Sequence, residues 1–460
     1  MQRIPLTPRP NWQHIVEAQG LTFHTPGGES DLGDGTPYWD ESAAYQFTAA
    51  EIDTLEAAAN ELQTMCLAAA QHIIDTRRYA DLLIPAAAVP AIEAAWNAEP
   101  PALYGRFDII WSGAQSPHPP KLLEYNADTP TSLLEAAVIQ WNWLEDLTPH
   151  LPTLSFQPEL NPSTLSSNPK LNPQTLSSRP ERPYPISPSS RPEREARSGE
   201  IPAFALGATP KPDQFNSLHE RLIAKWRDLT PHLQQPAYFA GVDTPEDTLT
   251  LAYIEDTAQQ AGLQTRRIPM LQIGWNAARH CFVDVHENQI QTLFKLYPWE
   301  TMLAEDFGPH ALQTYTQLTP NQMIWIEPIW KLLLSNKGLL PILWELFPNH
   351  PNLLESHFHN PHEMSAYVRK PLLSREGQNI SITYANGATI ETPGTYNTPD
   401  ARYIFQALAP EATFPDALGH PRHPVLGLWM IDQECAGMGI RESTGPITDN
   451  LSSFVPHLFR

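Results

Sequence analysis

Hydrophobic residues recur at helical spacing in several parts of the chain. Over 49–75 the apolar positions fall on one helical face, and Thr48 is available as an N-cap. The same spacing predicts helices over 132–147, which Thr129-Pro130-Thr131 would open, and over 249–261. The stretch 328–347 is apolar throughout and predicts a further helix, with Lys337 inside it.

Short apolar runs bounded by turn residues predict strands. The runs 107–111 and 121–125 are separated by a proline-rich turn, which is typical of two paired strands. After residue 366 the pattern predicts strands over 367–373, 379–384, 403–407 and 425–431, with Gly, Pro and Asn turns between them. This order indicates an α+β fold with an antiparallel sheet late in the chain.

Proline concentrates in one segment, residues 152–212, although the whole chain contains 48 prolines in 460 residues. Within it LNPSTLSSNP, starting at Leu160, is repeated as LNPQTLSSRP, starting at Leu171. The segment contains few large apolar residues, and burying them cannot offset the entropy lost when the chain is ordered. We therefore expect a mobile, extended segment. We interpret 152–212 as an insert within a single domain spanning 1–460; a plain linker is the alternative.

Charge and composition narrow the class of partner. The chain has 29 basic and 51 acidic residues, a net charge of −22, which disfavours nucleic acids and anionic membranes and suits a cationic small molecule. No apolar run approaches the roughly 20 residues that cross a bilayer. The N-terminus lacks the apolar stretch of a secretory signal, and three separated cysteines argue against a disulfide scaffold. We therefore expect a cytoplasmic protein.

Polar residues alternate along the first two predicted strands. Arg106 and Asp108 lie two residues apart, as do Glu124 and Asn126, so each pair faces one side of its strand. Antiparallel pairing would bring two carboxylates and an amide together, and these oxygen ligands suit Mg²⁺. Arg106 could then bind a terminal phosphate. The alternative is a surface salt bridge from Arg106 to Asp108 or Glu124.

Two later motifs could contact phosphate groups. The sequence YVRKPLLSREGQNISI, starting at Tyr367, predicts a hairpin in which Lys370 precedes a loop with a glycine. The sequence ECAGMGIRES, starting at Glu434, has Gly437 and Gly439 before Arg441. Either motif alone is common in turns.

Taken together these motifs resemble the synthetase domain of the glutathionylspermidine synthase family, which has an ATP-grasp fold. The resemblance extends from Trp12 to the C-terminus outside the insert and is carried by Arg106–Asp108, EYNAD at 124–128, SNKGLLPILW at 335–344, the Lys370 hairpin and GMGIRES. It implies that Asp108, Glu124 and Asn126 hold Mg²⁺. It also implies that Arg106 contacts the terminal phosphate of ATP and that Arg441 assists phosphate transfer.

The resemblance also assigns the remaining nucleotide contacts. Lys337 and Lys370 correspond to lysines that bind ATP phosphates, and Ser374, Arg375, Glu376 and Gly377 correspond to a phosphate lid, although Glu376 replaces a small residue. Gln406, Ala407, Leu408 and Ala409 correspond to the segment that cradles adenine.

On the substrate side the resemblance implies that Thr129 and Thr301 contact the peptide substrate. Glu246 and Asp247 correspond to an acidic pair on the polyamine side. The alternative for the acidic pair is that it only favours a helix N-terminus.

The expected activity is an ATP- and Mg²⁺-dependent ligase that forms carbon–nitrogen bonds. A peptide-type carboxylate would be activated as an acylphosphate and attacked by an amine, for example a polyamine. The alternative is a catalytically silent nucleotide-binding regulatory or scaffold protein. The presence of every charged residue named above argues against it.

Overall fold

The computed structural model describes residues 1–25, 37–147, 211–316, 323–396, 398, 401–450 and 452–460. Contacts within the chain join 1–149 and 212–460 into one compact unit. The expected mobile insert, 152–212, lies outside the described residues except at its last two positions, so its mobility stays a prediction. No helix in the described part of the chain is long and apolar enough to cross a membrane.

An antiparallel sheet made from distant parts of the chain carries most of the predicted chemistry. Its strands run in the order β19 (Ser453–Phe454), β18 (Glu434–Ser443), β17 (Pro421–Ile431), β3 (Tyr104–Ile110) and β4 (Lys121–Asn126), and β16 (Phe414–Pro415) adds to β17. The predicted pairing of the two early strands is confirmed, with Asp108 opposite Glu124 and Arg106 opposite Asn126. The late strand over 425–431 pairs with β3 and β18, and not with the other late strands predicted over 367–373, 379–384 and 403–407.

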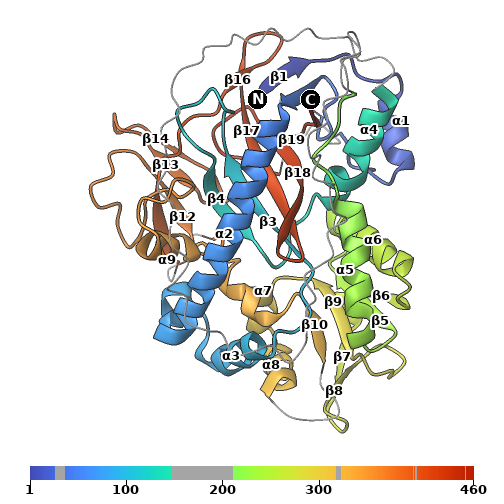
Figure 1. The fold of residues 1–460 in the computed structure, drawn as a ribbon. Helices are drawn as coiled ribbons and strands as arrows, with labels where there is room; N and C mark the ends of the chain where they lie inside the picture. The colour runs from blue at the N-terminus through green and yellow to red at the C-terminus, as the bar shows by residue number, and fades with distance from the viewer. Residues whose placement is uncertain (26–36, 148–210, 317–322, 397, 399–400, 451) are drawn as a thin grey trace, which may run out of the picture. The chain divides into compact units, whose positions relative to one another are not determined.

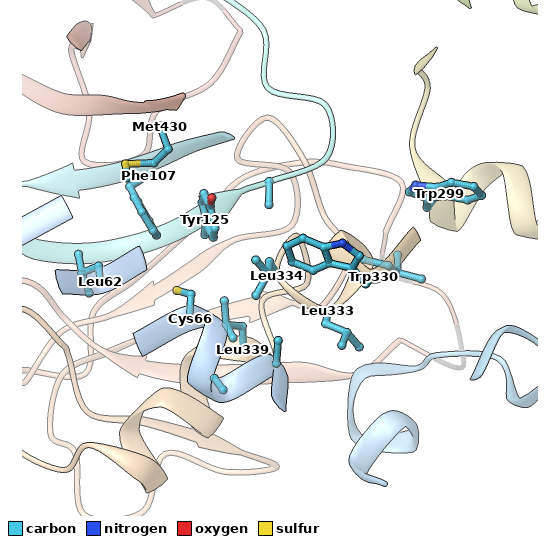
Figure 2. Packing of buried hydrophobic residues seen from close by; sticks show 14 of the residues in the cluster. Leu62, Cys66, Phe107, Tyr125, Trp299, Trp330, Leu333, Leu334, Leu339 and Met430 are labelled. Carbon is cyan, nitrogen blue, oxygen red and sulfur yellow. The ribbon is translucent and has the colours of Figure 1, made fainter. Parts of the chain in front are cut away.

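Alternation along β3 divides the two faces of this sheet. Phe107 and Ile109 are fully buried in the hydrophobic core, whereas Arg106 and Asp108 point to the opposite side and are partly exposed. Figure 2 shows Phe107 and Tyr125 packed near Leu62 and Cys66 of the helix that covers the apolar face.

That helix is α2 (Ala49–Thr76), which crosses β17 and β18 (Figure 1). The predicted N-cap is confirmed: Thr48 and Glu51 form a reciprocal capping box. On the other face of the sheet lie a π-helical turn (Glu135–Ile139), α4 (Gln140–Leu147) and α5 (Leu218–Leu229). The helix expected over 132–147 therefore forms, with a π turn inside it.

A second antiparallel sheet contains the Lys370 hairpin. Its order is β11 (Ser356–Phe358), β15 (Tyr403–Ala407), β12 (Tyr367–Pro371), β13 (Ser381–Thr383) and β14 (Thr389–Glu391), so an antiparallel sheet late in the chain is confirmed. Helix α9 (Leu339–Leu346) packs against β11 and β15.

The prediction of a single helix over 328–347 is wrong. A 3-10 helix (Ile329–Leu333) and α9 are separated by a turn that contains Lys337. Asn336 makes this break because its amide donates to the Leu82 carbonyl at 2.7 Å and accepts from Gly338 N–H at 2.8 Å. The backbone N–H of Lys337 donates to the Leu372 carbonyl of the second sheet at 3.0 Å.

A parallel sheet was not predicted from the sequence. It has the order β10 (Ile324–Ile326), β9 (Thr292–Leu296), β5 (Ala237–Gly241) and β6 (Thr265–Pro269). Helix α6 (Pro245–Gln260) connects β5 to β6 and confirms the helix expected over 249–261. Every residue of β5 and β9 is buried, so these strands lack the alternation that reveals a half-exposed strand.

The remaining elements complete the framework. They are β1 (Gln2–Pro5), β2 (Ala43–Phe47) and β20 (His457–Phe459), which form one sheet; the hairpin β7 (Gly274–Asn276) and β8 (Cys281–Val283); α1 (Trp12–Ala18), α3 (Val89–Ala98), α7 (Trp299–Ala304) and α8 (Gly308–Thr316); and short 3-10 turns at Arg78–Leu82, Ala86–Ala88, Thr230–His232 and Met270–Gln272.

Candidate active site

The three expected metal ligands converge on the polar face of the first sheet. The Asn126 amide donates to Asp108 Oδ2 at 3.2 Å and to Glu124 Oε1 at 3.1 Å. Arg106 also reaches Asp108, with Nε 2.7 Å from Oδ1, and donates to the Thr131 carbonyl at 2.8 Å. The salt bridge considered as an alternative is therefore present, but both partners are largely buried.

The charges in this group are unevenly balanced. Burial raises the pKa of Asp108, and the nearby Glu124 carboxylate adds to that rise, while Arg106 opposes it. Burial alone would also raise the pKa of Glu124, but Lys337 and Lys370 lower it to about 2. The Asp108 carboxyl resists ionisation beside the Glu124 carboxylate, and a bound cation would offset the repulsion between the two.

The set fits Mg²⁺ but is not a complete cage. No group of three or more His, Cys, Asp or Glu residues in the described part of the chain is arranged to hold a metal. Two carboxylates suit Mg²⁺ that also takes oxygens from water and phosphate. A half-turn of the Asn126 amide would present its oxygen to the same point.

The two predicted phosphate lysines lie together next to Glu124. Lys337 Nζ is 3.0 Å from Glu124 Oε2 and also donates to the Ser374 carbonyl. Lys370 Nζ donates to the Leu123 carbonyl at 2.9 Å and to Gln406 Oε1 at 2.7 Å. Burial lowers the pKa of Lys370 to about 8, although Glu124 acts in the opposite direction.

The segment expected to cradle adenine, residues 406–409, comprises the last two residues of β15 and the two residues after it. Gln406 is buried, and its amide donates to the Leu122 carbonyl at 3.1 Å while it accepts from Lys370. The N–H groups of Ala407 and Leu408 donate to the carbonyls of Glu355 and Ala366. The side chain of Gln406 thus ties the second sheet to β4, and contacts from 406–409 to a nucleotide stay a prediction.

The predicted lid, residues 374–377, lies beside Glu124, Asn126 and Lys337. Glu376 and Gly377 both have positive φ, 55° and 68°, which makes a sharp turn. A Cβ atom on Gly377 would lie 2.4 Å from the carbonyl oxygen of Thr448, so the lid touches the loop after β18. Arg375 of the lid donates to Thr129 Oγ1 at 3.0 Å and forms an ion pair with Glu300.

Arg441 extends from β18 into that loop. Its guanidinium donates to the carbonyls of Ser452 and Asp449 at 3.0 and 2.9 Å and lies 5.0 Å from the centre of the Tyr38 ring. The Tyr38 hydroxyl donates to Glu135 at 2.6 Å. Burial raises the pKa of Tyr38 well above its ordinary value, with Glu135 adding to that rise. Glu135 belongs to the π turn, a feature often found at functional sites.

The substrate-side residues are less uniform. Thr129 contacts the lid through Arg375, whereas the Thr301 side of α7 is exposed. Glu246 and Asp247 lie in the first turn of α6, as the helix-terminus alternative requires. Burial raises the pKa of Asp247 to about 6, and the Glu246 and Glu376 carboxylates contribute to the rise. The acidic pair is therefore close to the lid as well.

Several residues around this site were missed from the sequence. A small pocket is lined by Glu124, Asn126, Lys337, Ser374 and Arg375, and also by Glu300 and Ser335. Glu300 is the neighbour of Thr301, and Ser335 begins the SNKG motif, so both lay next to recognised positions. Tyr38 and Glu135 carried no such signal, because only the folded chain brings them to Arg441.

Comparison with known proteins gives this geometry a context. Residues 3–157 and 203–460 match the family described as glutathionylspermidine synthase preATP-grasp. A Haemophilus influenzae protein named "Putative acid–amine ligase" is 33% identical over 436 residues, covering 93% of this chain and 92% of the relative. The Crithidia fasciculata trypanothione synthetase is 25% identical over 84% of this chain, which spans 52% of that enzyme.

A solved structure supports the fold. The apo structure of a glutathione synthetase-like effector from Globodera pallida superposes with a TM-score of 0.50 at 9% identity, covering 90% of this chain and 89% of the effector. The expectation drawn from the R-x-D, EYNAD and GMGIRES motifs is thereby confirmed: the chain belongs to the glutathionylspermidine synthase family.

Proposed function

We propose that the chain is an ADP-forming acid–amine ligase that joins a peptide-type carboxylate to an amine. The observation that carries the proposal is the convergence of Asp108, Glu124 and Asn126 with Lys337 and Lys370 under a loop that contacts the Arg441 segment. Homology to acid–amine ligases and to glutathionylspermidine and trypanothione synthetases supports the reaction class.

The reaction would proceed in two transfers. A carboxylate oxygen of the acid attacks the terminal phosphorus of ATP, the bond to the bridging oxygen breaks, and ADP leaves. The amine nitrogen then attacks the acylphosphate carbonyl, loses a proton, and expels inorganic phosphate, leaving an amide.

The charged residues have separate tasks in this proposal. Asp108, Glu124 and Asn126 would hold Mg²⁺, which supplies charge neutralisation at the phosphate oxygens. Lys337 and Lys370 would bind phosphates as point charges, and Arg106 and Arg441 would stabilise charge that develops during transfer. The lid, with Ser374 to Gly377, would keep water from the acylphosphate until the amine reacts.

The substrates would bind next to the lid, which Thr129 contacts through Arg375. Thr129 and Thr301 are proposed to contact the acid, and Glu246 and Asp247 the cationic amine. An acidic pair near the lid is electrostatically suited to a polyamine, in keeping with the net charge of −22.

The test is an ADP-release screen of peptide carboxylates crossed with amines, with glutathione and spermidine as the first pair and product mass as the confirmation. Arg441→Ala protein purified in the same way controls for contaminating ATPase. Mass of an amide product from wild type alone would support the ligase. Binding of ATP with no acid- and amine-dependent ADP release would instead favour the regulatory alternative.

A further inference from the structure

Glu300 has a buried carboxylate oxygen with no donor among the described residues. Its Oε1 accepts from the Arg375 guanidinium, but Oε2 is buried and makes no hydrogen bond there. The side chain lines the pocket shared by Glu124, Asn126 and Lys337. A buried carboxylate oxygen without a donor is costly, so its partner is expected to arrive with a bound molecule.

The position of Glu300 is fixed from behind. Asp128 accepts from the backbone N–H of Trp299 at 2.9 Å and forms an ion pair with Lys295 at 2.6 Å, and both charged side chains are fully buried. This anchors the first turn of α7 to the segment after β4. Glu300 is therefore held in place and does not simply follow the lid.

The nature of the missing partner follows from what the site would bind. ATP phosphates offer only acceptors and would repel a carboxylate, so they cannot satisfy Oε2. Lys337 and Lys370 already have acceptors of their own. An N–H or ammonium group supplied by a substrate is the matching donor.

Arg375 defines which substrate carries that nitrogen. It donates to Glu300 Oε1 and to Thr129, so a carboxylate bound at Arg375 would lie beside the Glu300 side chain. We infer that Glu300 accepts a hydrogen bond from the nitrogen on the α-carbon of the reacting carboxylate, while Arg375 orients the carboxylate itself. The acid is then an α-amido or α-amino acid, such as a peptide C-terminus, and not a simple aliphatic acid.

This inference rests on the proposed function and adds a specificity-determining residue to it. The probes are glutathione and its depsipeptide analogue, in which an ester oxygen replaces the last peptide N–H. With ATP and spermidine saturating, we expect wild type to prefer the amide by about 10- to 100-fold in kcat/KM, the range for a hydrogen bond to a charged group. In Glu300→Gln we expect the preference to fall below about 3-fold, through KM for the acid.

Glu305→Gln, on the residue that follows α7 and bonds the Tyr297 hydroxyl, is the matched control and should keep the wild-type preference. Glu300→Asp tests the same point if the glutamine variant does not fold, and should show a reduced preference. An undiminished preference in Glu300→Gln, or a changed Mg²⁺ requirement in place of a changed KM for the acid, would overturn the inference while leaving the ligase intact. Absence of ADP release with every acid and amine would instead overturn the proposed function, and this inference with it.

Discussion

Asp108 illustrates how much of the site depends on single side chains. It is held by both Arg106 and Asn126 and faces Glu124 across the strand pair. Asp108→Asn keeps the size but removes the charge that would hold Mg²⁺. We expect turnover to fall by about 10²-fold or more, with a wild-type melting temperature.

ADP release measured over a range of Mg²⁺ concentrations tests the Asp108 prediction. Asp53→Asn, on an exposed position of α2, is the control and should behave as wild type. A variant that turned over at the wild-type rate would show that Asp108 is only the partner of Arg106.

We expect Asp247 to lower the stability of the folded protein while it contributes to amine binding. Its pKa of about 6 in the folded protein lies above its ordinary 3.8. The ionised carboxylate therefore destabilises the folded protein, and the full cost is present above about pH 6. Asp247→Asn should therefore raise the melting temperature at pH 8, and the gain should shrink as the pH falls below about 6. If the residue receives the amine, KM for the amine should rise about two- to five-fold at pH 8.

The matched variant Asp243→Asn lies at an exposed position just before α6 and should change neither quantity. Melting curves at pH 8 and pH 5 and amine titrations of ADP release give both readouts. A higher melting temperature with an unchanged KM would leave the acidic pair as a helix-terminus feature alone.

At the scale of elements, the contact between the lid and the loop after β18 is open to a matched test. Gly377 and Gly387 both have positive φ, 68° and 83°, so alanine strains the backbone at each. Only at Gly377 would the added Cβ collide with another loop, 2.4 Å from the Thr448 oxygen; at Gly387 nothing lies within 4 Å.

We expect Gly377→Ala to lower kcat about 10-fold or more because the lid cannot close, whereas Gly387→Ala should cost about 1 kcal/mol of stability and leave kcat unchanged. Steady-state ADP release and thermal melts distinguish the two effects. Equal kcat in both variants would mean that this contact does not contribute to closure.

The two loops should also differ in what they contribute to nucleotide binding. Lys370 lies on the strand before the lid and beside Gln406, whereas Arg441 is held by the carbonyls of its own loop. We expect Arg441→Ala to lower kcat by about 10²–10³ with little change in ATP affinity, and Lys370→Ala to lower both. Calorimetric titration with ATP and single-turnover rates check this; equal losses of affinity would contradict separate roles.

For the whole molecule, the prediction concerns the proline-rich segment. Asp213, just beyond it, exchanges backbone hydrogen bonds with Phe459 at 3.0 and 2.8 Å, so the body resumes at that point. Replacing 152–210 with a short Gly/Ser linker should leave the melting temperature and activity nearly unchanged, because a longer loop adds little closure entropy. A fall of several degrees would show that the segment packs on the body.

The fold and site were readable from the sequence where the signal is local. Period-two alternation placed Arg106 and Asp108 on one side of a strand, and the N-cap residue Thr48 predicted where α2 begins. The resemblance of five dispersed motifs added the family. All of these depend on a few neighbouring residues or on a pattern retained in the chain.

Other features were decided only by tertiary structure. The parallel sheet was missed because β5 and β9 are buried on both faces and show no alternation, and the helix over 328–347 is interrupted because Asn336 bonds the distant Leu82. Glu300 reaches the site because Asp128 fixes the start of α7, and Tyr38 meets Arg441 across about 400 residues of sequence. Such contacts depend on which segments fold against each other. Burial on both faces of a strand and pairing between distant segments leave no periodic pattern in the sequence.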